Sequence, residues 1–151
     1  MTERAGGSPR RGALPPPWRA LLPLGIALVA MGVFLPGLDG AFLEWDDRTN
    51  FLQNPHYRGF GLAHLRWMLT TGLMGHWIPL TWLSLAVDWR LWGLEPFGYH
   101  LTSLILHGAA AVAFYFVARR LLVLAQPRAE DRTVTLGAAV AGRFFGLPPL
   151  R

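Results

Sequence analysis

Three carboxylates lie within residues 44–47, which read Glu-Trp-Asp-Asp. Carboxylates this close repel one another, so a folded chain keeps them only where Arg48, a metal ion or a cationic partner compensates. Such a cluster could supply a general base or a cation site. Asp46 or Asp47 could instead cap a short helix that continues through Phe51, because aspartate is a favoured cap residue. The sequence leaves both interpretations open.

Two further segments could contact a charged substrate. Residues 54–59 begin with an Asn-Pro turn signal and contain Arg58, which could bind a phosphate bidentately or pair with the acidic cluster. Residues 75–82 contain His76 and Thr81 near the start of an expected helix. His76 could contact a phosphate or a sugar, although a lone histidine beside a tryptophan more often makes a structural hydrogen bond.

The remaining candidate ligands do not form a metal site. His100 and His107 lie seven residues apart, on nearly one helix face, whereas metal ligation favours a spacing of four and needs a third ligand. Packing or a buried hydrogen bond is the better interpretation of this pair. The chain has no cysteine, which excludes disulfides and zinc–thiolate sites. The one cofactor left to consider is a divalent cation near Asp46 and Asp47.

The composition shows what kind of scaffold must position these side chains. Hydrophobic residues make up 52% and charged residues 15% of the chain, against about 25% charged in a soluble domain. Some apolar surface therefore faces lipid. Every basic residue is arginine, and many of them flank the apolar runs, as on the cytoplasmic side of a membrane. The flanking arginines are Arg4, Arg10, Arg11, Arg19, Arg119, Arg120, Arg128 and Arg132. We therefore expect a membrane-lipid partner and no nucleic acid.

The apolar runs predict an all-α integral membrane protein with two full transmembrane helices and a partial third. The uncharged run 21–38 is close to the ~20 residues that a bilayer requires. A cleaved signal peptide is the alternative, but the run continues without a break. The predicted parts are a disordered cytoplasmic tail (1–17), transmembrane helix 1 (18–38), an external loop (39–98), transmembrane helix 2 (99–124), a cytoplasmic turn (125–133) and a truncated transmembrane helix 3 (134–151).

The loop 39–98 is slightly acidic and contains six of the seven tryptophans, which prefer the membrane interface. Two juxtamembrane helices are expected in it, at about 62–71 and 79–92. The second begins with a proline and ends before a glycine, as helices often do. It carries one narrow polar stripe, made of Thr81, Ser84 and Asp88.

An ordered set of motifs runs through the same region. It comprises Trp45-Asp-Asp47, Asn54-Pro55, Pro79-Leu-Thr81, Asp88, Gly-Leu-Glu-Pro-Phe-Gly-Tyr-His over 93–100, and His107. From about Leu22 onward, the chain resembles the bacterial relatives of the transmembrane and tetratricopeptide-repeat O-mannosyltransferases. These belong to the GT-C glycosyltransferase class, whose members use lipid-phosphate-linked sugars. The repeat domain and most of the family's spans are missing, which indicates a fragment. In addition, Pro148 stands where the family normally has histidine.

The resemblance implies a site. Asp46 would be the catalytic base that deprotonates an acceptor hydroxyl, and Asp47 would support it or bind a cation. His76 and Thr81 would lie near the substrate, and Arg58 joins them as a candidate phosphate ligand. The donor would be a polyprenyl-phosphate sugar and the acceptor a hydroxyl, for instance on a protein.

We therefore expect the N-terminal part of a membrane glycosyltransferase, truncated and inactive by itself. The alternative is a non-catalytic membrane anchor of a tetratricopeptide-repeat interaction protein. A transporter fragment is disfavoured because neither full span carries an acidic residue. The all-arginine usage indicates a GC-rich bacterial genome, and hence the inner membrane, with the N-terminus cytoplasmic and residues 39–98 periplasmic.

Overall fold

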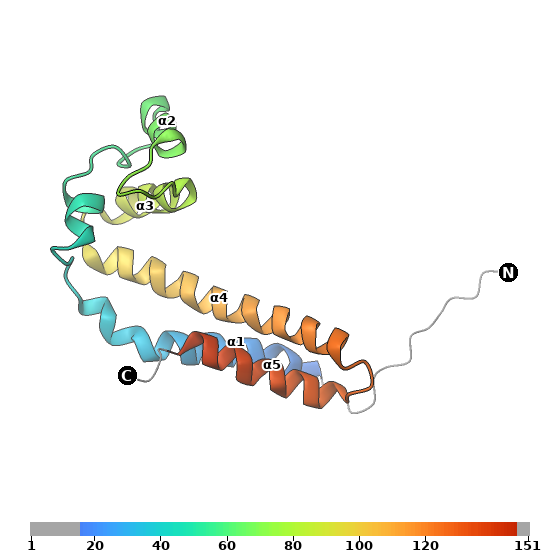
Figure 1. Ribbon diagram of the computed structural model, residues 1–151. Coiled ribbons are helices and arrows are strands. Elements are labelled where there is room, and N and C mark those ends of the chain that lie inside the picture. The colour runs from blue at the N-terminus through green and yellow to red at the C-terminus, as the bar shows by residue number, and fades with distance from the viewer. Residues whose placement is uncertain (1–15, 148–151) are drawn as a thin grey trace. The chain divides into compact units, whose positions relative to one another are not determined.

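The computed structural model describes residues 16–147, which are all-helical and contain no strand. This confirms the predicted all-α class. Most of the tail 1–17, and Pro148, lie outside the described residues. The elements (Figure 1) are α1 Pro16–Phe34, the 3-10 helix η1 Leu35–Asp39, the π-helical turn η2 Arg48–Leu52, α2 Leu62–Thr70, α3 Pro79–Trp92, α4 Pro96–Ala125 and α5 Asp131–Gly146.

Two stretches of helix are long and apolar enough to cross a membrane, Leu21–Asp39 and Pro96–Ala125. Helix α5 is shorter, at 16 residues. Helix α1 begins at Pro16, so it shares two residues with the predicted tail (1–17). Proline is tolerated in the first turn of a helix, where its missing N–H would have no intrahelical partner.

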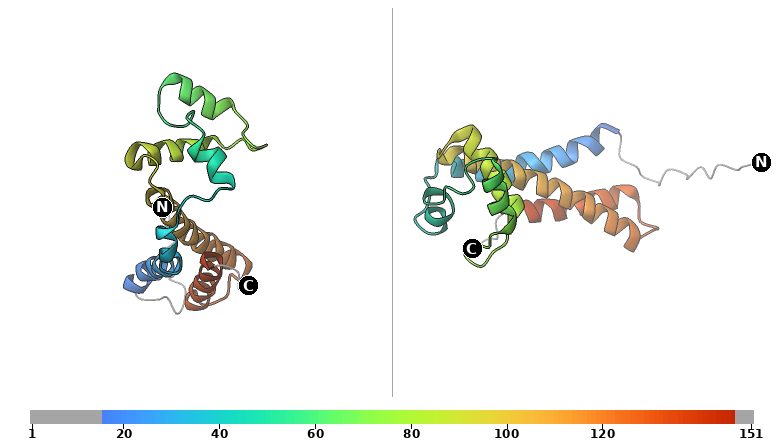
Figure 2. Two further views of the ribbon diagram at one scale, coloured as in Figure 1. Left: turned by 90° about the vertical axis from the view of Figure 1, so that its left-hand side faces the viewer. Right: turned by 90° about the horizontal axis from the view of Figure 1, so that it is seen from above.

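The chain divides into two compact units. Within the described residues, the helical unit comprises 16–34 and 105–147, and the aromatic unit comprises 35–104. The helical unit contains α1, the later part of α4, and α5, which lie alongside one another (Figure 2). Its buried core consists of Ile26, Ala30, Ala111, Tyr115 and Ala138.

Small side chains let these three helices approach closely. A Cβ atom added at Gly142 would lie 3.2 Å from the Tyr115 Cβ, and one at Gly146 would lie 3.0 Å from the Ala30 Cβ. Both contacts are tighter than ordinary van der Waals packing. Helix α5 therefore depends on its glycines to lie against α1 and α4.

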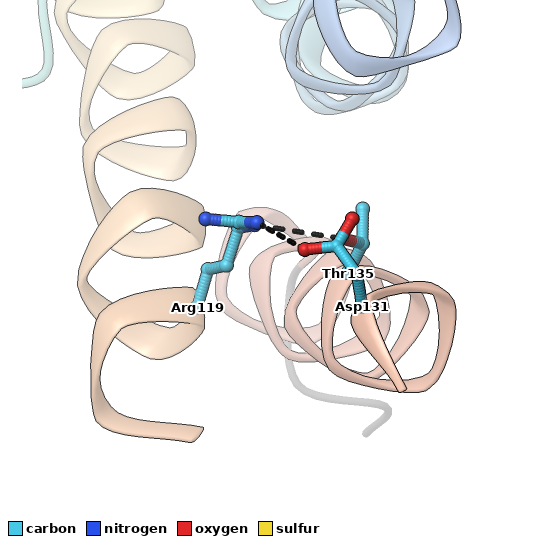
Figure 3. A network of polar contacts seen from close by, with 3 residues as sticks. All are labelled: Arg119, Asp131 and Thr135. Carbon is cyan, nitrogen blue, oxygen red and sulfur yellow. Dashed lines mark hydrogen bonds and ion pairs between the residues drawn. The ribbon is translucent and has the colours of Figure 1, made fainter. Parts of the chain in front are cut away.

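An ion pair joins α4 to the start of α5 (Figure 3). An Arg119 Nη2 donates to the Asp131 carboxylate at 2.7 Å, and Arg119 Nε lies 3.4 Å from the Thr135 hydroxyl. Asp131 is buried in the first turn of α5, where the positive end of the helix dipole also favours a carboxylate. The pair fixes the turn between α4 and α5.

The aromatic unit has its own core, made of Tyr57, Met68, Trp82, Ala86 and Tyr99. The Tyr57 and Tyr99 hydroxyls lie 3.0 Å apart, and the Tyr99 hydroxyl donates to the Gly93 carbonyl at 2.9 Å. Trp82 is 1% exposed, whereas Trp45 is 84% exposed. The loop tryptophans therefore do not all occupy the same environment. The contacts of α2 and α3 bury some of them within the protein, and others are exposed.

Candidate functional site

The carboxylates Asp46 and Asp47 form a helical turn that leads into η2. Asp46 is exposed, and Asp47 is half-buried. An oxygen of Asp47 accepts the backbone N–H of Leu43 at 2.8 Å, and its side chain makes no cap hydrogen bond to η2. Asp47 thus fastens the preceding loop instead of capping the helix through Phe51. Asp46 is therefore exposed to solvent, next to an aspartate whose carboxylate is held by a hydrogen bond.

The side chain of Arg58 reaches the C-terminal end of η2. One of its terminal nitrogens donates to the carbonyls of Phe51 and Leu52, at 2.6 and 2.8 Å. Its guanidinium carbon also lies 4.8 Å from the centre of the Trp89 ring, within the range of a cation–π contact. Within residues 16–147, Arg58 makes no ion pair with the acidic cluster. Its main visible role is to satisfy the last carbonyls of η2.

We expect Arg58→Ala to lower the free energy of unfolding by about 1–3 kcal/mol, because it leaves two carbonyls without their charged donor. The free energy of unfolding of Arg58→Lys should lie between those of the wild type and Arg58→Ala, since lysine is a point charge without the planar fork of arginine. Thermal unfolding in detergent measures the effect, with the exposed Arg66→Ala as a matched control. If Arg58→Ala and Arg66→Ala behave alike, Arg58 is not needed for the fold and is free for a substrate.

His76 and Thr81 lie elsewhere in the aromatic unit, around the turn between α2 and α3. The backbones of Leu73 and His76 exchange two hydrogen bonds, at 2.9 and 3.0 Å. Met74 and Gly75 between them have φ values of 52° and 82°, the left-handed pair that a tight hairpin turn requires. His76 and Thr81 are both exposed. No hydrogen bond within the described residues links either of them to Asp46 or Asp47.

The polar stripe on α3 divides between two environments. Thr81 is exposed, whereas Asp88 is 3% exposed and its carboxylate accepts the Thr102 hydroxyl of α4 at 2.5 Å. Burial raises the pKa of Asp88 above its usual range, and the Thr102 hydrogen bond partly opposes this rise. The sequence singled out Asp88 by its spacing, but it did not show that α4 covers it.

The raised pKa of Asp88 makes stability depend on pH. The folded state holds this proton more tightly than the unfolded state, so this contribution to stability is greatest at low pH. It falls as the pH rises from the ordinary value of 3.8 through the raised folded-state pKa. Asp88→Asn keeps an oxygen for Thr102 and should remove this loss. Unfolding measured across that range checks it, with the exposed Glu95→Gln as control; parallel profiles for Asp88→Asn and wild type would contradict it.

Both histidines of α4 bind backbone carbonyls. His100 Nε2 lies 3.1 Å from the Gly40 oxygen, and His107 Nε2 lies 3.0 Å from the Gly146 oxygen. His107 also meets the edge of the Phe34 ring. The sequence favours packing or a buried hydrogen bond for this pair, and each histidine makes a hydrogen bond to a backbone carbonyl.

The described residues gather no group of three or more metal-ligating side chains. A divalent cation beside Asp46 and Asp47 would therefore need additional oxygen ligands, from a bound phosphate or from water. Asp46 and Asp47 directly precede η2, and the Arg58 side chain binds the carbonyls at its end. His76 and Thr81 belong to a different part of the aromatic unit.

These features define an all-helical protein of a membrane, with two candidate spans and an exposed carboxylate shortly after the first of them. Over 133 residues, 83% of the chain, the sequence is 31% identical to Protein O-mannosyl-transferase Tmtc1 of Drosophila melanogaster. The matched region makes up only 14% of that relative. No protein-family model and no solved structure matches the chain. The similarity supports the resemblance to the O-mannosyltransferases and a membrane location.

Proposed function

We propose that this chain forms the N-terminal, membrane-embedded region of a glycosyltransferase of the O-mannosyltransferase type. The observation that carries the proposal is the similarity to an O-mannosyl-transferase across 83% of the chain, which includes the acidic turn. This similarity does not favour the alternative of a non-catalytic anchor. The chain corresponds to a small part of that relative, so catalysis would also use residues that lie outside the matched region.

In the proposed reaction, Asp46 accepts the proton of an acceptor hydroxyl while the hydroxyl oxygen forms a bond to C1 of the sugar. The bond between C1 and the phosphate oxygen of the donor breaks, and the polyprenyl phosphate leaves with the bonding electrons. The exposure of Asp46 supports this role, because a general base must come within hydrogen-bond reach of the acceptor.

Asp47 would hold the turn that presents Asp46, through its bond to the Leu43 N–H. A divalent cation at Asp46 and Asp47 would neutralise charge on the departing phosphate, with the donor supplying the remaining ligands. His76 and Thr81 would contact the sugar or the acceptor after the substrates bind. Arg58 would support the site through η2, and could also bind the donor phosphate.

The proposed topology places the N-terminus in the cytoplasm of a bacterium and residues 39–98 on the opposite side of the inner membrane. The arginines at the end of α4 and around the following turn support it, since short cytoplasmic loops are enriched in basic residues. Arg119 is a weaker signal than the others, because it also forms the ion pair with Asp131.

A chimera tests the proposal. This chain would replace the corresponding region of the Drosophila relative, and mannose transfer from a polyprenyl-phosphate mannose to a serine- and threonine-containing peptide would be measured in membranes. We expect transfer above that of the relative lacking the region. A chimera that inserts and folds but transfers no sugar would contradict the proposal and favour the anchor.

A further inference from the structure

An apolar groove runs along the helical unit between α1 and α5, with a volume of about 670 Å³. The α1 wall is formed by Trp18, Leu21, Leu22, Gly25, Ile26 and Val29. These residues recur at helical spacing and so form one continuous stripe. The α5 wall is formed by Leu136, Ala139 and Val140, together with one charged residue, Arg143.

Arg143 lies close to the level of the middle of the two candidate membrane spans. Its neighbour Gly142 packs against Ile26, and Gly146, one turn further on, packs against Ala30. Ala30 is the central residue of the candidate span Leu21–Asp39. The contacts with α4 place Arg143 at the same level. Gly142 also packs against Ala111 and Tyr115, which lie near the middle of the span Pro96–Ala125.

The guanidinium of Arg143 has no hydrogen bond or ion pair with any residue of 16–147, and the side chain is exposed. A charged side chain at the centre of a bilayer is costly unless it finds an opposite charge or water. Arginine cannot lose its proton to avoid this cost. The groove therefore needs an occupant that brings an anionic group to the level of Arg143.

We infer that the groove is a docking surface for a further membrane-spanning helix that carries an aspartate or glutamate near its middle. Apolar walls suit the lipid-facing side chains of a helix, and Gly25 and Ala139 allow a close approach. A second copy of this chain does not fit, because neither candidate span carries a carboxylate at that depth. A lipid phosphate is disfavoured, since phosphates lie at the membrane surface and Arg143 lies close to the level of the middle of the candidate spans.

Two glycines of α1 supply matched variants. A Cβ at Gly25 or at Gly32 would meet nothing within 4 Å, so the backbone of α1 leaves open space for a side chain at either position. Gly25 lines the groove and Gly32 does not. Gly25→Leu would therefore block the approach of a helix, whereas Gly32→Leu would leave it open.

The test uses the full chain in phosphatidylcholine vesicles, labelled at a single introduced cysteine, because the native chain has none. The probes are leucine- and alanine-rich peptides of about 20 residues, identical except for a central glutamate or leucine. Association is measured by energy transfer between the labelled chain and each labelled peptide. We expect the glutamate peptide to bind about tenfold more tightly than the leucine peptide. Arg143→Leu should abolish the difference, Gly25→Leu should weaken binding, and Gly32→Leu should not.

Three outcomes would overturn the inference. The first is equal or absent binding of the two peptides to the wild-type chain. The second is self-association that depends on Arg143, which would assign the groove to a second copy. The third is stabilisation of the chain by phosphatidylglycerol that disappears in Arg143→Leu, which would assign the groove to a lipid phosphate. None of these measurements depends on sugar transfer, so they are independent of the proposed enzymatic role.

Discussion

Replacing Asp46 by asparagine is expected to lower sugar transfer by the chimeric enzyme about 10²–10⁴-fold, the usual contribution of a general base. Asparagine has nearly the same shape but cannot accept the hydroxyl proton. Because Asp46 is exposed, the fold should not change. The rate of mannose transfer, compared at equal amounts of inserted protein, measures the effect.

Glu44→Gln is the matched control for Asp46→Asn, since it removes one negative charge from the same exposed turn without touching the proposed base. We expect Glu44→Gln to retain most of the activity. Asp47→Asn keeps an oxygen for the Leu43 N–H and thereby separates the charge of Asp47 from its hydrogen bond. Full activity in Asp46→Asn would exclude Asp46 as the base.

The second large effect is expected at Gly142. A leucine there would bring its Cβ within 3.2 Å of the Tyr115 Cβ and 3.4 Å of the Ile26 Cδ1, with the rest of the side chain still to be placed. Helix α5 would have to move away from both neighbours. Overpacking of this kind costs about 1–3 kcal/mol, and occasionally more. Thermal unfolding in detergent, followed by circular dichroism, should show a lower midpoint.

Gly32→Leu is the control for Gly142→Leu, because it makes the same change in helix propensity where nothing lies within 4 Å of the new Cβ. It should unfold at or above the wild-type temperature, since leucine favours a helix by close to 1 kcal/mol over glycine. Equal midpoints for the two variants would show that α5 is not held by close packing at Gly142.

The sequence alone determined the helical class and the two long apolar helices. Both follow from local properties, namely the length of uncharged runs and the proline and glycine signals at helix ends. The sequence also identified most of the chemically interesting residues: Asp46, Asp47, Arg58 and Asp88. A residue type reports what a side chain can do, whatever its neighbours are.

Only the tertiary structure decided what those side chains contact. Arg58 had two proposed partners, and the structure gave it a third, the carbonyls at the end of η2. Asp88 is buried, and its carboxylate accepts a hydrogen bond from Thr102, 14 residues away on another helix. The level of Arg143 relative to the candidate spans follows from the packing of Gly142 and Gly146 against α1. Periodicity shows which residues share a helix face, but the neighbour that covers the face is set by packing between segments far apart in the chain.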